Sequence, residues 1–191
     1  GLTNINSTEP VLDDEELERA AQWVAPRISQ RCTESFIQLD RDGYSPLLKP
    51  QFYRAVKDVL DFFLSKYFEA PFVFMHRQDY ITYHDPKSHD APSREIRFLT
   101  REELWKVHTL ALKYVALLER KKGLNRLFEK LGTENDYFQE CFSGIQSVEE
   151  VADLMQWLTL TYGHRLREAQ ADVREDADAM ADLDTEGLNG A

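Results

Sequence analysis

Apolar side chains recur every three or four residues over long stretches of this chain, and this periodicity limits its possible folds more than any other feature. One such stripe consists of Phe52, Val56, Val59, Phe63 and Tyr67. Pro50 precedes it and suits a first helical turn, where its missing N–H costs nothing. The spacing predicts a helix that ends at residues 69–71, because the residue before a proline avoids helical backbone angles.

Two further helices have recognisable start signals. Thr100 with Glu103, and Ser147 with Glu150, each form a capping box, in which the hydroxyl accepts a backbone N–H and the glutamate reaches back. The stripe after the first box is Leu104, Val107, Ala111, Val115 and Leu118. The stripe after the second is Val148, Val151, Met155, Leu158, Tyr162 and Leu166. Both boxes therefore predict long amphipathic helices.

The remaining local signals fit the same helical picture. Gly123 is expected to break or bend the helix that starts at Thr100, and Gly132 is expected to cap its C-terminus. Residues 71–80 fit either a short helix that starts at its proline or a buried strand. Residues 83–97 are predicted to form a polar loop, and no alternating segments joined by Asn-Gly or Asp-Gly indicate a hairpin. The predicted fold class is all-α, an irregular helical array.

The formal charge of −11 is concentrated at the two ends of the chain. Residues 1–20 carry −5 and residues 168–191 carry −7, so residues 21–167 carry +1. This division predicts a flexible acidic segment over 1–20, a helical core over 21–167 and a disordered tail or linker over 168–191. A strongly acidic chain is a poor candidate for nucleic-acid binding, but a nearly neutral core does not exclude it.

No arrangement of residues indicates catalysis or a bound metal. His76, His84 and His89 lie in or beside a proline-interrupted loop without fixed spacing, so solvated side chains are favoured over metal ligands. Cys32 and Cys141 fit no zinc spacing and no disulfide framework, which favours packed thiols in an intracellular protein. A phosphate-binding glycine loop and a nucleophile elbow are both missing. We therefore expect no enzymatic activity, no cofactor and no metal.

One cluster of basic residues has the spacing of a phosphate-binding helix face. Helical spacing places Lys122, Arg126 and Lys130 on one face, with Lys121 beside them. A nucleic-acid backbone would use such a face. The alternative is an ordinary solvated face that is balanced by neighbouring glutamates.

Two segments carry a resemblance to a known family. The first is Phe68-Glu69-Ala70-Pro71-Phe72-Val73-Phe74-Met75-His76-Arg77-Gln78-Asp79-Tyr80, and the second runs from Leu99 to Lys130. Their order resembles the N-terminal helical core of the eukaryotic transcription elongation factor and histone chaperone called suppressor of Ty number six. A weaker likeness extends to the bacterial relative Tex. The resemblance covers residues 50–168 and includes Tyr162-Gly163 in the last helix.

The resemblance implies a helix-turn-helix-like unit within a nuclear, non-enzymatic scaffold. Such a scaffold acts with elongating RNA polymerase II, handles histones and helps to reassemble nucleosomes. Where Tex has Arg-Tyr-Arg-Lys, this chain has Met75-His76-Arg77-Gln78, so Arg77 alone keeps the positive charge. The family's RNA-binding barrel, its nuclease-like domain and its phosphopeptide-reading tail are not part of this sequence.

Two hypotheses for function follow. The favoured one is an interaction scaffold that binds histones, RNA polymerase II and elongation-complex proteins, with the acidic ends attracting basic histone tails. Its expected core is Phe52, Val56, Phe63, Leu104, Val115, Leu118, Phe128, Val151 and Leu158. The alternative is a DNA- or RNA-binding helix-turn-helix module. Its candidate contacts are Arg77, Lys121, Lys122, Arg126 and Lys130.

Overall fold

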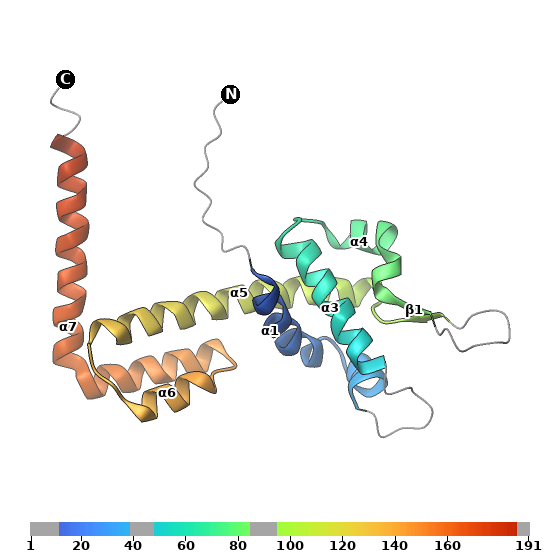
Figure 1. Cartoon of the computed structure of the whole chain (residues 1–191), viewed down its shortest axis with the longest axis horizontal. Coiled ribbons are helices and arrows are strands. Elements are labelled where there is room, and N and C mark those ends of the chain that lie inside the picture. Colours follow the sequence, from blue (N-terminus) through green and yellow to red (C-terminus); the bar gives the residue numbers. More distant parts are fainter. Residues whose placement is uncertain (1–11, 39–47, 85–94, 187–191) are drawn as a thin grey trace. The chain divides into compact units, whose positions relative to one another are not determined.

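The computed structural model describes residues 12–38, 48–84 and 95–186 and confirms the all-α fold class (Figure 1). The helices are α1 (Asp14–Val24), α2 (Gln30–Cys32), α3 (Leu48–Leu64), α4 (Ala70–His76), α5 (Arg101–Lys130), α6 (Asp136–Ser143) and α7 (Val148–Glu186). A π-helical turn over Thr33–Ile37 extends α2, and 3₁₀ turns occupy Ala25–Arg27 and Gln78–Ile81. None of the described helices is long and apolar enough to cross a membrane.

Internal contacts divide the chain into two compact units, in place of the expected single core. The first unit is Gly1–Val115 and the second is Ala116–Ala191, and α5 contributes residues to both. The division between the units at residue 115 therefore differs from the boundaries at residues 20 and 167 that the charge distribution predicted.

The first unit is built on α1 and α3, which pack against each other. The expected flexible segment is wrong from residue 14 onward, because α1 begins there. Asp13 caps this helix by accepting a 2.8 Å hydrogen bond from the backbone N–H of Glu16. Leu17 and Ala20 are buried on its inner face, so apolar spacing prevails over the acidic composition. The earlier part of the predicted segment lies outside the described residues.

A helix-turn-helix-like unit is formed by α3, a short connection and α4. The connection is closed by a 2.9 Å hydrogen bond from the backbone N–H of Phe68 to the carbonyl oxygen of Phe62. Tyr67 adopts a φ of 54°, a left-handed conformation that a bulky side chain rarely takes. Of the two alternatives for residues 71–80, the short helix is confirmed, with Pro71 in its first turn.

Two short strands replace the ends of the predicted polar loop over 83–97. β1 (Thr82–His84) pairs antiparallel with β2 (Glu95–Arg97), and Tyr83 lies opposite Ile96. Ile81 and Phe98 flank the pair and are buried, so they hold the two strands together from the core side. The hairpin escaped prediction because no tight two-residue turn joins the strands. Residues 85–94 lie outside the described part of the chain.

The start of α5 follows the predicted capping box. The backbone N–H of Glu103 donates to Thr100 Oγ1 at 3.2 Å, and the backbone N–H of Thr100 donates to Glu103 Oε1 at 2.9 Å. The predicted break at Gly123 is wrong, since α5 continues through it to Lys130. A glycine costs a helix only about 1 kcal/mol relative to alanine, and packing of the buried Leu124 offsets this. Gly132 has a φ of 61°, which confirms the predicted cap.

The core differs from the expected one along α5. Val115 and Leu118 are only half-buried, whereas Tyr114 and Leu117 are buried. The inward face of the helix therefore follows the predicted stripe through Ala111 and is displaced from it by one residue from Tyr114 onward. The other expected core residues are buried: Phe52, Val56, Phe63, Leu104, Phe128, Val151 and Leu158.

The second unit packs the end of α5 with α6 and the first half of α7. Phe138 is fully buried, and its ring stacks on Phe128 with centroids 3.8 Å apart. The second capping box is also present, since the backbone N–H of Glu150 donates to Ser147 Oγ at 3.2 Å. Non-helical backbone angles at Tyr162 kink α7.

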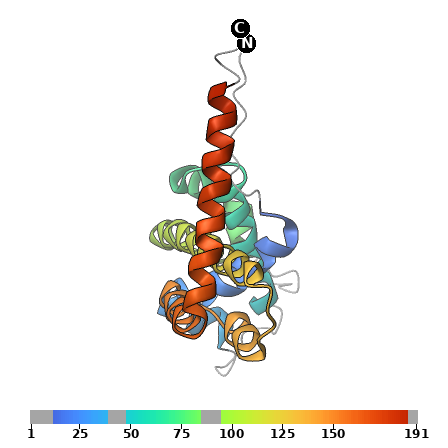
Figure 2. The ribbon, with the colours of Figure 1, turned by 90° about the vertical axis from the view of Figure 1, so that its left-hand side faces the viewer.

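Beyond the kink, α7 continues as a helix to Glu186 (Figure 2). Residues 168–186 are thus helical where a disordered tail or a linker was predicted, and the linker alternative stays a prediction. The described side chains of these residues are exposed, as expected for a segment without a core. The recurring alanines and the glutamates of this segment favour a helix, against the lower helix propensity of its aspartates.

Candidate interaction surfaces

A buried carboxylate joins α2 to the start of α5 in the first unit. Glu103 is only 8% exposed and accepts a 2.5 Å hydrogen bond from Ser29 Oγ. It also pairs with Arg31, which in turn donates to the carbonyl oxygen of Phe98 at 2.8 Å. Burial opposes ionisation of Glu103, but the hydrogen bonds from Arg31, Ser29 and Cys32 outweigh it and lower its pKa to about 2. The carboxylate is therefore ionised and holds these elements together.

The same cluster decides the chemistry of Cys32. This thiol is fully buried, and its Sγ lies 3.0 Å from Glu103 Oε2. Burial raises the pKa of Cys32 to about 12, so the thiol stays protonated and is a poor nucleophile. Cys141 is half-buried in the second unit. The prediction of a packed thiol holds for Cys32.

The helix-turn-helix-like unit presents a surface of large apolar side chains, which we call the aromatic surface. Its members are exposed side chains of the α3–α4 connection, of α4 and of the following 3₁₀ turn. They are Tyr67 (67% exposed), Phe72 (38%), Met75 (64%) and Tyr80 (50%). Beside them lies a hollow of about 480 Å³, lined by Phe62, Lys66, Phe68, His76, Arg77, Asp79 and Tyr80. Sequence reasoning missed this surface, because apolar residues at helical spacing are usually core.

The cations on the aromatic surface are engaged by its rings. The Arg77 guanidinium lies 5.4 Å from the ring centroid of Phe68 and 5.3 Å from that of Phe72. Lys66 Nζ lies 5.0 Å from the ring of Phe62 and 3.4 Å from the Asp61 carboxylate. Arg77 thus has a local structural role, and its predicted contact with nucleic acid stays a prediction.

The other candidate nucleic-acid residues all lie on α5 within the second unit. Lys122, Arg126 and Lys130 are exposed. Lys121 differs from them, since it is half-buried with its Nζ 5.1 Å from the ring centroid of Phe142. The structure therefore keeps three of the predicted cations together on one face and gives Lys121 a packing contact.

Arg126 and Lys130 border a hollow of about 430 Å³ that α7 completes. Its lining residues are Gly123, Arg126, Leu127, Lys130, Gln170 and Arg174. Sequence reasoning missed Arg174 because it belongs to a segment with a charge of −7. The available signal was that Arg174 is the only base of residues 168–191.

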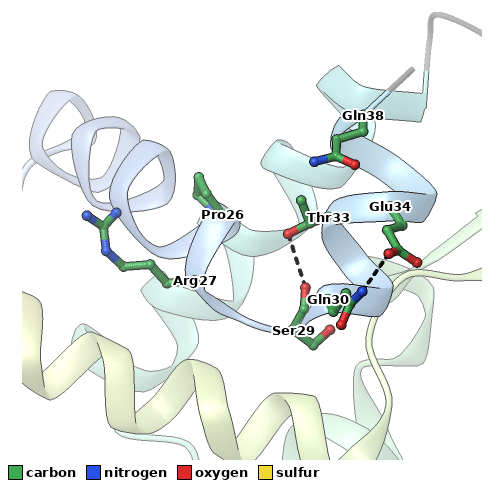
Figure 3. A pocket seen from close by; sticks show the side chains of 7 residues that line it. All are labelled: Pro26, Arg27, Ser29, Gln30, Thr33, Glu34 and Gln38. Atoms are coloured by element: carbon green, nitrogen blue, oxygen red, sulfur yellow. Dashed lines mark hydrogen bonds between the residues drawn. The ribbon is translucent and has the colours of Figure 1, made fainter. Parts of the chain in front are cut away.

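A third hollow, of about 420 Å³, lies beside α2 (Figure 3). Its side chains are largely satisfied by one another: Gln30 Nε2 donates to Glu34 Oε1 at 2.7 Å, and Thr33 Oγ1 donates to the carbonyl oxygen of Ser29 at 3.1 Å. Polar groups that already have partners offer little to a ligand, so we assign this hollow no function.

The histidines of the predicted loop are separated in the structure. His84 lies on β1 with its Nδ1 3.7 Å from Glu95 Oε1, and His76 packs against Phe72 at the end of α4. His89 lies outside the described residues. No group of three potential metal ligands occurs among the residues that the structure describes.

Comparison with known proteins finds a family match over most of the helices. A family model described as the helix-turn-helix DNA-binding domain of SPT6 matches residues 10–136, about two thirds of the chain. The match covers α1 to α5 and reaches the start of α6.

Relatives named transcription elongation factor SPT6 match over most of the chain. The protein of Mycosarcoma maydis is 30% identical over 222 aligned positions, which cover 98% of this chain and 13% of that protein. The protein of Neurospora crassa is 29% identical, with 84% of this chain and 12% of that protein covered. The protein of Schizosaccharomyces pombe is 27% identical, with 67% and 9% covered.

The chain thus spans about an eighth of the length of the first two relatives. The resemblance stated from residues 68–80 and 99–130 is confirmed, because both segments fall within the matched domain. This chain belongs to the SPT6 family and contains the helix-turn-helix domain of that family.

Proposed function

We propose that this chain is a non-enzymatic protein-interaction module of a nuclear transcription elongation factor. Its proposed partners are RNA polymerase II, elongation-complex proteins and histones. The name shared by the relatives supports the role in elongation, and a nuclear location follows from such a role. The observation that carries the proposal is the aromatic surface of the helix-turn-helix-like unit.

The aromatic surface has the composition of a protein interface. Aromatic residues, methionine and arginine are enriched in such interfaces, and lysine and glutamate are depleted. Tyr67, Met75 and Tyr80 are each at least half-exposed, and large apolar side chains of this kind serve as anchors in protein interfaces. Lys66 and Arg77 border the adjacent hollow, against a single lining carboxylate from Asp79. Lys66 pairs with Asp61 and Arg77 lies over aromatic rings, so the exposed apolar side chains carry our assignment of this surface to a protein of the elongation complex.

Direct reading of DNA by α4 is the less favoured use of this unit. A recognition helix presents basic and polar side chains to the groove and to phosphates. The exposed side chains of α4 are Phe72, Met75 and His76, and Arg77 at its end packs on aromatic rings. These contacts support protein binding better than phosphate binding.

Histone binding is assigned to the acidic end of the chain. Beyond its kink, α7 carries exposed carboxylates, among them Asp172, Glu175 and Asp176. The helix holds these carboxylates at regular spacings. Their negative charge attracts basic segments of a partner and raises the rate of association. The array suits a histone chaperone that helps to reassemble nucleosomes.

The double variant Tyr67→Gly with Met75→Ser tests the aromatic surface. We expect its affinity for purified RNA polymerase II to fall about tenfold or more, the loss typical of removing a hot-spot side chain from the centre of an interface. Biolayer interferometry on the intact chain measures the change. The fold is retained, since glycine adopts the φ of 54° at position 67 without steric cost.

Leu160→Ser is the matched control, because it removes another side chain that is 80% exposed. It should leave polymerase binding unchanged. Equal affinities of the double variant, the control and the unmodified chain would reject the aromatic surface as the docking site.

Neutralising the acids of α7 tests the histone assignment. In the variant Asp172→Asn, Glu175→Gln, Asp176→Asn, the association rate with a histone H3–H4 complex should fall severalfold, and its salt dependence should weaken. Stopped-flow fluorescence at two salt concentrations measures both. If the rate and its salt dependence do not change, these carboxylates have no part in histone binding.

A further inference from the structure

The positive charges of the second unit are gathered from two helices onto one hollow. Arg126 and Lys130 line it from α5, and Arg174 lines it from α7. None of these three cations has an ion-pair partner among the residues that the structure describes. Unpaired cations that converge on a shared hollow indicate a site for an anion.

Beyond the kink, basic residues of α7 recur on one side of the helix. Arg167, Gln170 and Arg174 follow each other at spacings of three and four residues, so they share one side of the helix. Asp172, with the acids at 168, 175 and 176, projects roughly 100° or more away from Arg174 around the helix axis. The part of α7 that meets the hollow therefore presents Arg174 and no carboxylate to it, and Asp178, one turn further along the same side, lies outside the lining.

Two hydrogen bonds fix where this side of α7 lies relative to the end of α5. Asn135 Nδ2 donates to Tyr162 Oη at 2.9 Å at the kink. One turn later, Arg165 Nη2 donates to the carbonyl oxygen of Leu131 at 2.8 Å. Leu166, which is 3% exposed, packs beneath them. The second half of α7 thus starts from an anchored position beside the end of α5.

We propose that this two-helix face binds the phosphate backbone of nucleic acid, independently of base sequence. We call it the α5–α7 basic face and define it by Lys122, Arg126, Lys130, Arg167 and Arg174. It is a binding site separate from α4 of the helix-turn-helix-like unit. Its α5 residues lie inside the matched domain of residues 10–136, and its α7 residues lie beyond it.

The layout of the face favours a row of phosphates over a single phosphate group. Lys122 and Lys130 are separated by about 12 Å along the α5 axis, a length over which one DNA strand advances about three or four nucleotides. A phosphorylated side chain would need its cations at one point. The lining of the hollow includes no aromatic ring for base stacking, so the contacts are to the backbone.

Titration of the intact chain with a 20-base-pair duplex over a range of salt concentrations tests this proposal. We expect the unmodified chain to bind with a negative log–log salt slope. Arg174→Ala and Arg126→Ala should each weaken binding and reduce the magnitude of the slope by about one, because each removes one phosphate contact. Arg174→Lys keeps the charge and should restore most of the binding. The matched control is Arg120→Ala, an exposed arginine on another side of α5.

The outcomes separate the proposal from its competitors. The proposal is supported if Arg174→Ala weakens duplex binding while Arg120→Ala and Arg174→Lys retain it. Absence of duplex binding at low salt, or equal effects of Arg174→Ala and Arg120→Ala, overturns it. Tighter binding of a singly phosphorylated peptide than of the duplex also overturns it and assigns the face to a protein ligand. None of these results depends on the aromatic surface.

Discussion

Replacing Glu103 by glutamine is expected to lower the free energy of unfolding by about 3 kcal/mol at neutral pH. The buried carboxylate accepts hydrogen bonds from Ser29, Arg31 and Cys32, and also from the backbone N–H of Thr100. A glutamine side chain cannot balance the charge of Arg31, and its amide group presents donors to other donors. Urea unfolding at pH 7, followed by circular dichroism, measures the loss.

The same variant has a defined pH dependence. The pKa of Glu103 in the folded chain is about 2, below the ordinary value of 4.5, so its stabilising effect is present above pH 4.5. The effect is lost as the pH falls toward 2. The stability difference between the unmodified chain and Glu103→Gln should therefore shrink from pH 5 to pH 2. Glu119→Gln, at an exposed position of α5, is the control. A difference that is independent of pH would contradict the buried ion pair.

Replacing Phe138 by alanine should cost about 3–5 kcal/mol, the usual range for a fully buried phenylalanine. Its ring stacks with those of Phe128 and Phe142, with centroids 3.8 Å and 5.7 Å away. The resulting cavity would lie inside the second unit. Hydrogen exchange measured by mass spectrometry should show lost protection in α6 and in the first half of α7, with α1 and α3 unchanged.

Tyr137→Ala is the matched control, since it truncates a side chain of α6 that is 55% exposed. It should change stability by about 1 kcal/mol or less. Equal loss of protection in α1 and α3 after Phe138→Ala would show that the two units unfold together, against the division of the chain at residue 115.

Sequence reasoning succeeded where structure depends on neighbouring residues. The capping boxes at Thr100 and Ser147 form because their partners lie three positions away, and Gly132 caps α5 by its own backbone freedom. The short helix at Pro71 was one of two alternatives, since seven residues contain too little periodicity to exclude a strand.

The features that escaped prediction depend on residues far apart in the sequence. Glu103 was recognised as a cap, but its burial requires Ser29 and Arg31, more than 70 positions earlier. The β1–β2 pair depends on packing of Ile81 and Phe98 rather than on a turn motif. Composition suggested disorder for the acidic end because the segment has too few apolar residues to form a core. The helix propensity of individual residues was not considered.

The candidate sites show the same limit. Lys122, Arg126 and Lys130 were found because one helix spaces them, whereas Arg174 joins them only through the fold of the second unit. Net charge concealed this arginine within an acidic segment. The exposure of Tyr67 depends on a left-handed turn that no sequence pattern announces in a residue other than glycine or asparagine.

A crossed binding measurement tests the central claim most directly: that the aromatic surface binds protein and the α5–α7 basic face binds nucleic acid. Tyr67→Gly with Met75→Ser, and Arg126→Ala with Arg174→Ala, would each be titrated with RNA polymerase II and with the duplex under one buffer condition. We predict that the first variant binds the polymerase more weakly and the duplex unchanged. The second variant should bind the duplex more weakly and the polymerase unchanged. Loss of both ligands by the same variant, with its fold intact, would contradict the separation of the two surfaces.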